Sequence, residues 1–280
     1  MKGRIIRIIT EYIARKNKVS FVKYFDSTWL NNNNTLDHLT IISFSGEKQF
    51  ADQLYSIASF YINVGKPGKW TIYSDGSHSK ESRAILDKLP GVLLVDWGES
   101  IVPAAYRNEN NNLIKKIFNY RTVQIDSTTI FIDSDVLFYK KFVEFLPFLR
   151  KRNWFIVDEY FGALDEPFKT NVGFDMYPCN SGFLIFNTQP NWEIVMDYLN
   201  TQLTTKEGLQ NWSEQTAFHV LTRGFKEFLP LEPKYFVVDG SDSFKYKSDF
   251  DYDKIAVRHF VGPIRHKMWQ YPWKKILDIQ

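Results

Sequence analysis

The sequence alternates short apolar runs with amphipathic segments, and this pattern constrains the fold more than any other feature. Each run is only four or five residues long, which suits a buried strand, and the apolar residues of the amphipathic segments recur at helical spacing. The apolar runs lie at residues 39–43, 70–74, 92–95, 129–133, 154–158 and 183–187, and the helical segments at 51–62, 79–89, 111–125 and 191–203. Such alternation predicts an α/β fold with a single Rossmann-like, mostly parallel sheet flanked by helices on both faces.

The first 34 residues differ from the rest of the chain. Residues 1–18 combine basic side chains with an apolar helical face, and an Asn run at 31–34 ends this part. The apolar face consists of Ile5, Ile8, Ile9, Tyr12 and Ile13. We therefore predict a basic amphipathic helix and polar linker over 1–34, followed by one domain over 35–280. The helix suits peripheral contact with an anionic membrane surface, and packing against the domain or a partner protein is the alternative.

Composition excludes several classes of protein. The net charge of +3 over 280 residues gives no global signal for nucleic-acid binding. No run of about 18 apolar residues predicts a membrane-spanning helix, and Arg7 and Glu11 interrupt the apolar core that a secretory signal needs. Cys179 is the single cysteine, so a disulfide within the chain is impossible. These features predict a cytoplasmic protein, in solution or at the inner face of the membrane.

Two carboxylates follow an apolar run in the stretch FIDSDV, with Ser134 between Asp133 and Asp135. Neighbouring carboxylates repel each other and are costly to bury, so something must neutralise them. Hard oxygen ligands suit Mg²⁺ or Mn²⁺, and phosphate oxygens can complete the coordination. Because ligands bind beyond the carboxyl ends of the strands in open α/β sheets, the pair predicts a metal site at that edge. A plain turn is the alternative, since aspartate is common in turns.

Two classes of enzyme place such a pair after a buried strand. In phosphatases of the haloacid-dehalogenase type the first Asp is a nucleophile and the second a general acid, which would give these roles to Asp133 and Asp135. That motif normally opens its domain, whereas here several strands and helices are predicted before it. In nucleotide-sugar glycosyltransferases of GT-A fold the pair instead holds a metal on the donor diphosphate.

Several later motifs resemble those of family-8 glycosyltransferases, which have the GT-A fold, and they occur in the family's order over residues 39–269. The motifs are the helix with Lys115 and Lys116, FIVDEY (155–160), YPCNSGFLIFN (177–187), SEQTAFHVL (213–221) and VRHFVGPIRHKMW (257–269). The resemblance implies a metal-dependent enzyme that moves a sugar from a nucleotide diphosphate donor, a UDP-sugar, to an acceptor hydroxyl with retention of configuration. A carbohydrate, a lipid-linked molecule or a protein could be the acceptor. A non-catalytic sugar-binding relative is the third alternative.

The resemblance also implies roles for individual residues. Asp133, Asp135 and His259 would hold the Mn²⁺ or Mg²⁺ ion, His259 through a neutral imidazole. Residues implied to bind the donor are Ser43, Lys116 (or Lys115), Ser134, Gly262, Arg265 and Lys267. Residues implied on the catalytic and sugar-binding side are Asp158, Asn180, Ser181, Glu214 and Gln215. In an inverting reaction, Asp158 or Glu214 would have to act as the base.

Two departures from the family pattern limit what the resemblance implies. Arg265 stands where the family usually has a Lys, and Lys267 comes two residues later, so either cation could contact the diphosphate. The early segment IISFSGEKQF (41–50) lacks the family's Asp or Thr and following Tyr, which leaves the base and the sugar open. Acceptor recognition is expected from the variable loops 159–179 and 239–253.

Overall fold

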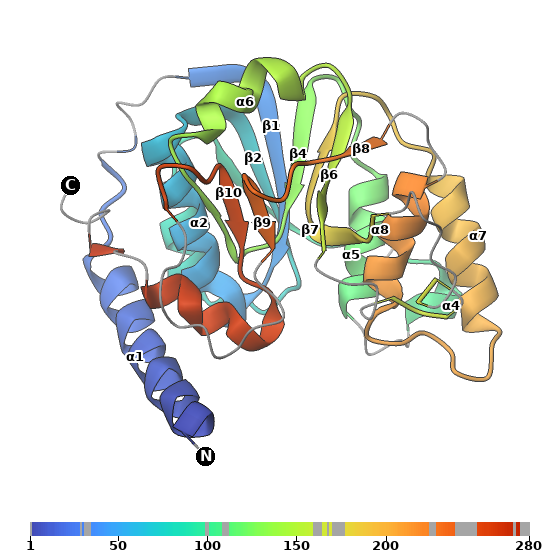
Figure 1. Ribbon diagram of the computed structural model, residues 1–280, viewed down its shortest axis with the longest axis horizontal. Coiled ribbons are helices and arrows are strands. Elements are labelled where there is room, and N and C mark those ends of the chain that lie inside the picture. Colours follow the sequence, from blue (N-terminus) through green and yellow to red (C-terminus); the bar gives the residue numbers. More distant parts are fainter. Residues whose placement is uncertain are drawn as a thin grey trace.

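A computed structural model describes residues 2–28, 30, 35–98, 101–107, 112–158, 164–166, 168–169, 177–223, 228–238, 251–270 and 273–274. Its centre is a seven-stranded sheet with the order β3-β2-β1-β4-β7-β6-β8 (Figure 1). The strands are β1 (Thr35–Ser45), β2 (Lys66–Ser74), β3 (Val92–Asp96), β4 (Thr128–Ile132), β6 (Asn153–Val157), β7 (Cys179–Phe186) and β8 (Phe228–Pro230). Each of the six predicted apolar runs forms one of these strands, and β8 is the addition.

Six of the seven strands run in the same direction. The strands β1, β2, β3 and β4 pair in parallel, and β6 pairs in parallel with β8, but β7 is antiparallel to both of its neighbours, β4 and β6. The predicted mostly parallel sheet is therefore confirmed, with β7 as the exception. An apolar run predicts that a strand is buried, but it carries no information on the direction in which the strand runs.

Helices cover both faces of the central sheet, as predicted. Successive residues of a strand point to opposite faces, and in β1 Ile41 packs into one apolar core while Ile42 packs into the other. The helices of the body are α2 (Phe50–Asn63), α3 (Lys80–Leu86), α4 (Ala104–Arg107), α5 (Asn112–Arg121), α6 (Phe142–Leu149), α7 (Trp192–Leu203) and α8 (Ser213–Arg223). α2, α3 and α6 contribute to the core around Ile41, whereas α5, α7 and α8 contribute to the core around Ile42 (Figure 1).

Local hydrogen bonds set the ends of two predicted helices. Ser79 caps α3, because its hydroxyl accepts a hydrogen bond from the backbone N–H of Ser82 at 3.1 Å. α5 ends at Arg121 rather than at residue 125. The hydroxyl of Thr122 donates to the carbonyl of Asn119 at 2.7 Å and so satisfies a carbonyl of the last turn.

A second, three-stranded sheet lies beside the central one and brings distant segments of the chain together. It consists of β5 (Val136–Phe138), β10 (Val257–His259) and β9 (Phe236–Val238), with β10 in the middle. The sequence predicted a single sheet and did not predict this second one. Its strands have only three residues each, which is too short to give a period-2 pattern. In the antiparallel pair β5–β10, His259 lies opposite Val136. This register places His259 next to the predicted carboxylate pair.

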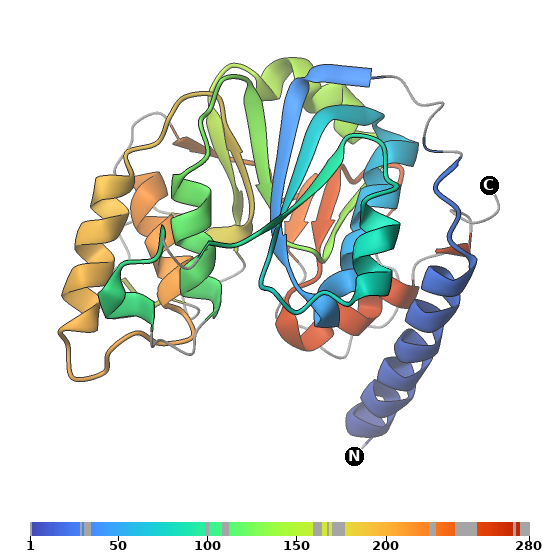
Figure 2. The same ribbon diagram turned by 180° about the vertical axis from the view of Figure 1, so that it is seen from behind.

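The N-terminal helix α1 (Lys2–Tyr24) packs on the body through its second half. Ala14 and Phe21 are buried there, against α2 and a 3-10 helix, η5 (Gly262–Gln270). The first half extends beyond the body in both views (Figures 1 and 2). Among the residues that the structure describes, no helix is both long enough and apolar enough to cross a membrane. The Asn run at 31–34 lies outside the described residues, so the division of the chain near residue 34 stays a prediction.

Candidate functional site

Asp133 and Asp135 lie on a tight link between the two sheets. β4 ends at Ile132 and β5 begins at Val136, so the link has only three residues. The backbone N–H of Asp133 donates to the carbonyl of Gly182 at 3.0 Å, and the carbonyl of Asp135 accepts from the N–H of Phe260 at 3.0 Å. The link is therefore fixed to β7 on one side and to the end of β10 on the other.

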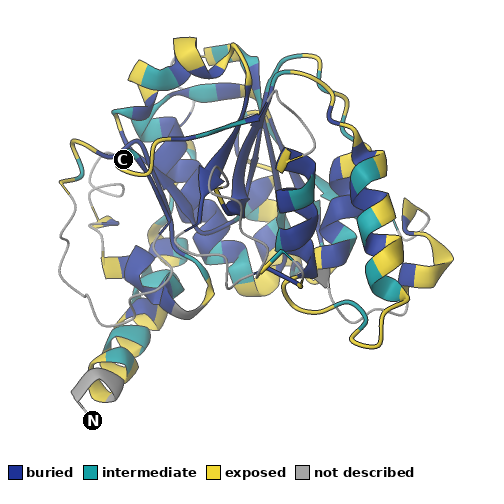
Figure 3. Ribbon diagram, turned by 45° about the vertical axis from the view of Figure 1, so that its right-hand side comes forward, coloured by how far each residue is buried: buried dark blue, intermediate teal, exposed yellow. Residues whose placement is uncertain are grey.

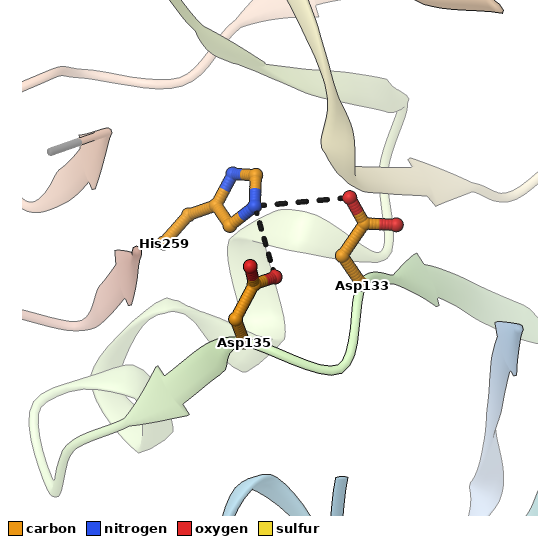
Figure 4. A group of neighbouring side chains, drawn as sticks. All are labelled: Asp133, Asp135 and His259. Carbon is orange, nitrogen blue, oxygen red and sulfur yellow. Dashed lines mark ion pairs between the residues drawn. The ribbon is translucent and has the colours of Figure 1, made fainter. Parts of the chain in front are cut away.

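His259 completes a group of three potential metal ligands with the two aspartates (Figure 4). Its Nε2 lies 3.2 Å from Asp135 Oδ1 and 3.7 Å from Asp133 Oδ2. One ligand atom from each of the three residues lies within 4.8 Å of the others. Asp135 Oδ1 is buried and, apart from the ring of His259, faces no hydrogen-bond partner within the described residues. Two carboxylates and an imidazole fit a divalent cation, and an unsatisfied buried oxygen is the position that such a cation would satisfy.

Gly182 on β7 makes room for the imidazole of His259. A Cβ atom at residue 182 would lie 2.0 Å from Cε1 of that ring and 2.6 Å from Nε2. Real Cβ atoms do not approach other heavy atoms so closely, so any side chain here would displace the ring. Gly182 belongs to the motif YPCNSGFLIFN (177–187), whose predicted strand begins one residue later. The structure places it within β7, where the imidazole of His259 approaches the strand closely.

Lys116 pairs with two carboxylates, the partly exposed Asp133 and the buried Glu214. Its Nζ lies 2.7 Å from Asp133 Oδ1 and 2.7 Å from Glu214 Oε1, and the side chain is buried. Burial by itself lowers the pKa of Lys116, but the two carboxylates outweigh burial and raise the pKa well above its usual value. Burial also raises the pKa of Glu214, an effect that Lys116 opposes only in part. The structure thus brings Lys116, rather than Lys115, to the carboxylate pair.

Arg265 on η5 provides the second cation of the site. Its Nε donates to Asp135 Oδ2 at 2.6 Å, and its side chain is 34% exposed. Burial raises the pKa of Asp135, but Arg265 and His259 outweigh burial and hold that pKa below its usual value. Burial lowers the pKa of His259, but Asp135 outweighs burial and raises it above 6.5. Asp135 is therefore ionised, and His259 holds a proton more tightly than an ordinary histidine.

A second cluster around Asp158 lies at the end of β6. Asp158 Oδ2 accepts from Asn180 Nδ2 at 2.8 Å and from Gln215 Nε2 at 3.0 Å. Asn180 Oδ1 in turn accepts from the N–H of Gly182 at 2.9 Å. The hydroxyl of Ser181 donates to Glu214 Oε2 at 3.0 Å. Hydrogen bonds therefore join Asp158, Asn180 and Gln215 to the glycine that borders His259, and a separate hydrogen bond joins Ser181 to Glu214.

Replacing Asn180 with alanine should destabilise the protein through this network. The change removes one donor from Asp158 and leaves the buried N–H of Gly182 without its acceptor. We expect the free energy of unfolding to fall by about 2 kcal/mol, which urea denaturation would measure from the midpoint at constant slope. Asn211→Ala at an exposed position is the matched control and should change little. Equal midpoints for the two variants would show that this network does not stabilise the fold.

A cleft of about 780 Å³ opens beside the carboxylate pair. Its lining includes five residues of the site or of adjoining segments: Leu113, Lys116, Asp133, Ser134 and Arg265. The remaining lining comes from residues 44–49, at the end of β1 and just beyond it, and from Asp75 and Ser77, after β2. These segments lie at the carboxyl ends of parallel strands, where ligands bind in such sheets.

Three residues predicted for the donor site occupy different environments. Ser43 does not line the cleft: it is buried, and its hydroxyl accepts a hydrogen bond from Trp70 Nε1 at 3.1 Å. Lys267 is buried in η5, whereas Arg265 lines the cleft. Gly262, at the start of η5, has a φ of 20° and open space around the position of a Cβ atom. Of the two candidate cations, Arg265 therefore has direct access to a ligand in the cleft.

Residues 44–49, Asp75 and Ser77 were not assigned to the site from the sequence. Gly46 was an available signal, because it follows a buried strand and interrupts the apolar pattern. A Cβ atom there would lie 2.2 Å from Asp75 Oδ2, so any side chain at this position would have to displace the carboxylate of Asp75. The proposed acceptor loops, 159–179 and 239–253, lie largely outside the described residues.

Comparison with solved structures identifies the fold. The galactosyltransferase LgtC, in complex with donor and acceptor sugar analogues, matches with a TM-score of 0.57 at 12% identity, over 86% of this chain and 94% of LgtC. An active-site mutant of LgtC matches over the same shares with a TM-score of 0.58 at 13% identity. The glycosyltransferase GlyE of Streptococcus pneumoniae TIGR4 matches with a TM-score of 0.53 at 15% identity, over 85% of this chain and 62% of GlyE.

Sequence comparisons give no such match. No family model matches the chain, and no curated protein does. At identities of 12–15% the structural likeness establishes the fold and leaves the activity to be argued from the site. The structural relatives are glycosyltransferases, and the fold of this chain is the GT-A fold that its motifs predicted.

Proposed function

We propose that this protein is a metal-dependent glycosyltransferase that moves a sugar from a UDP-sugar to an acceptor hydroxyl with retention of configuration. The observation that carries the proposal is the convergence of Asp133, Asp135 and His259 beside a cleft at the carboxyl edge of the sheet. Arg265 and Lys116 line the same cleft, and cations there suit a diphosphate. A volume of about 780 Å³ is within the range of sites for small ligands.

Mn²⁺ or Mg²⁺ held by Asp133, Asp135 and His259 would stabilise the negative charge that develops on the leaving diphosphate. Arg265 would add hydrogen bonds to the diphosphate oxygens, since its partly exposed side chain lines the cleft and its position is held by Asp135. Ser134, also in the lining, offers a hydroxyl and a backbone N–H. Gly262 leaves open space in which the backbone of η5 could approach a ligand.

The sugar would lie toward Asp158, Asn180 and Gln215, whose amide and carboxylate groups suit sugar hydroxyls. An inverting enzyme needs a carboxylate base. Glu214 is poorly suited to that role, because Lys116 and Ser181 already engage its two oxygens. Asp158 likewise receives hydrogen bonds from two side chains. A retaining reaction needs no free carboxylate base. It therefore agrees better than an inverting reaction with the hydrogen bonds and the ion pair that Asp158 and Glu214 already form.

The phosphohydrolase alternative requires Asp135 to act as a general acid, and a general acid must carry a proton. Asp135 instead has a lowered pKa, because Arg265 and His259 outweigh the effect of burial. Arg265 at one oxygen of Asp135 and His259 at the other favour its ionised form, which suits a metal ligand better than a proton donor. The geometry favours the transferase over the phosphatase at this point.

Calorimetric titration with UDP, in the presence and absence of Mn²⁺, tests the proposal. We expect UDP to bind much more tightly with Mn²⁺ present, and a panel of UDP-sugars and acceptors to yield transfer to at least one acceptor. UDP binding that is indifferent to Mn²⁺ would contradict the metal site. Covalent phosphorylation of Asp133 would favour the phosphohydrolase, and metal-dependent donor binding without turnover would favour a non-catalytic sugar-binding protein.

Metal affinity should depend on pH through His259. An imidazole must be neutral to bind a metal, and the pKa of this one is raised above 6.5, because Asp135 outweighs burial. The affinity for Mn²⁺ should be constant above that raised pKa and fall by about tenfold per pH unit below it. Titrations of Mn²⁺ across the range would measure the slope. The His259→Asn variant should bind more weakly and lose this dependence, whereas a wild-type affinity that does not change with pH would exclude His259 as a ligand.

A further inference from the structure

Helix α1 presents different chemistry on its two sides. The side that faces the body is bound to it, with Ala14 and Phe21 buried. Lys18 Nζ pairs with Asp52 at 2.7 Å, and Asn17 donates to the carbonyl of Trp269 at 3.0 Å. The opposite side carries most of the large apolar residues of the helix. Those more than two-fifths exposed are Ile5, Ile6, Ile8, Ile9, Tyr12, Ile13, Val19 and Tyr24.

This orientation is the reverse of that in an ordinary surface helix. A helix on a globular protein turns its apolar stripe toward the core and its charged face toward water. Here the spacing of Ile5, Ile8, Ile9 and Tyr12 produces a continuous stripe that points away from the body. The exposed bands along α1 are visible in Figure 3, and the first half of the helix projects from the body. A contiguous exposed apolar stripe of this kind marks an interaction surface.

The charge of the helix indicates what the stripe binds. α1 contains seven Lys or Arg residues and one acidic residue, Glu11. Glu11 pairs with Arg7 at 2.8 Å, while Arg15 and Lys16 are exposed near the stripe. Two copies of α1 packed stripe to stripe would bring this positive charge together, which disfavours self-association. An anionic lipid surface accepts apolar side chains below its headgroups and attracts Lys and Arg at its surface.

We propose that α1 docks on an anionic lipid surface, with its apolar stripe in the surface and its opposite side still bound to the body. The docking uses exposed residues that are not among the proposed metal ligands. It is independent of the proposed transferase activity, so failure of either one leaves the other intact.

Sedimentation of the full chain with lipid vesicles tests the proposal. Vesicles of phosphatidylcholine are compared with vesicles that also contain phosphatidylglycerol. The variant Ile5→Asp/Ile9→Asp places charges at positions that are 54% and 51% exposed. Its matched control, Leu93→Asp/Val143→Asp, makes the same change at positions off α1 that are 47% and 46% exposed. Circular dichroism and thermal melts check that both variants are folded.

Wild type and the Leu93/Val143 control should sediment with the anionic vesicles, and the Ile5/Ile9 variant should remain in the supernatant. Replacing Arg15 and Lys16 with glutamine should weaken binding by about fivefold per charge, and added salt should weaken wild-type binding in the same direction. No binding to anionic vesicles, or equal binding to both kinds, would overturn the proposal. The proposal would also be overturned if wild type did not bind vesicles but formed a dimer without lipid, as measured by sedimentation velocity, and if the Ile5/Ile9 variant did not form that dimer.

Discussion

The variant Asp135→Asn is expected to lose Mn²⁺-dependent UDP binding and to reduce sugar transfer by about a thousandfold. Asp135 is buried, its Oδ1 faces His259 Nε2 at 3.2 Å, and its Oδ2 receives the Arg265 guanidinium at 2.6 Å. An amide is neutral and offers a single oxygen, so it cannot neutralise a cation, and its one oxygen cannot both bind the metal and accept from Arg265. The same substitution therefore affects both the metal ligand and the positioning of the cation expected at the diphosphate.

Asp126→Asn, at an exposed position, is the matched control and should bind and turn over like wild type. Calorimetry would follow UDP and Mn²⁺ binding, and transfer of a labelled sugar would follow activity. Thermal melts should show that the Asp135 variant is folded, since relief from repulsion with Asp133 offsets part of the loss of Arg265. Wild-type metal-dependent binding by the Asp135 variant would remove the carboxylate pair from the proposed mechanism.

Gly182→Ala should also impair metal binding, although residue 182 has no side chain that could act as a ligand. The new Cβ would lie 2.0 Å from the ring of His259, so the ring must move away from the two aspartates. Loss of a positioned ligand lowers metal affinity or activity by about 10- to 100-fold. Gly208→Ala is the control. Its Cβ enters open space, but the positive φ of 62° strains the backbone of any residue other than glycine, so this variant tests for backbone strain without a clash.

A double variant separates the steric explanation from general damage. If the Cβ acts by striking the ring, Gly182→Ala/His259→Ala should be more thermally stable than Gly182→Ala alone, because the clash is gone. Its metal affinity should equal that of His259→Ala, since the two changes remove the same ligand and are not additive. A further loss of metal affinity in the double variant would mean that Gly182 acts on the site by another route.

Much of the fold could be predicted because its information is local. Ile41 and Ile42 face opposite cores, as do Ile130 and Phe131, so strands buried on both faces read as unbroken apolar runs. The direction of β7 could not be predicted, since it depends on the connection before it. The small sheet was missed for a related reason: β5, β9 and β10 are stabilised by pairing with each other across the chain rather than by their own pattern.

The residues of the site likewise fall into two groups, those with a local signal in the sequence and those without one. The pair Asp133 and Asp135 stands out locally, because two carboxylates after a buried strand demand an explanation. The closeness of Gly182 to His259 has no local signal, since it arises where β7 passes the end of β10. Ser43, which the resemblance implied for donor binding, is buried and does not line the cleft. The hydroxyl of Ser43 accepts a hydrogen bond from Trp70, whereas Phe44 and Ser45, the last two residues of the same strand, line the cleft.

The contact between α1 and η5 has a geometric consequence for any acceptor. Lys18 and the indole N–H of Trp269 share the buried carboxylate of Asp52, and the same 3-10 helix carries Arg265 to the cleft. A lipid surface that binds α1 would therefore also fix the height and the tilt of the cleft relative to that surface. An acceptor anchored in that surface would reach the cleft by diffusion in two dimensions at a fixed standoff, whereas a freely dissolved acceptor would have no such advantage.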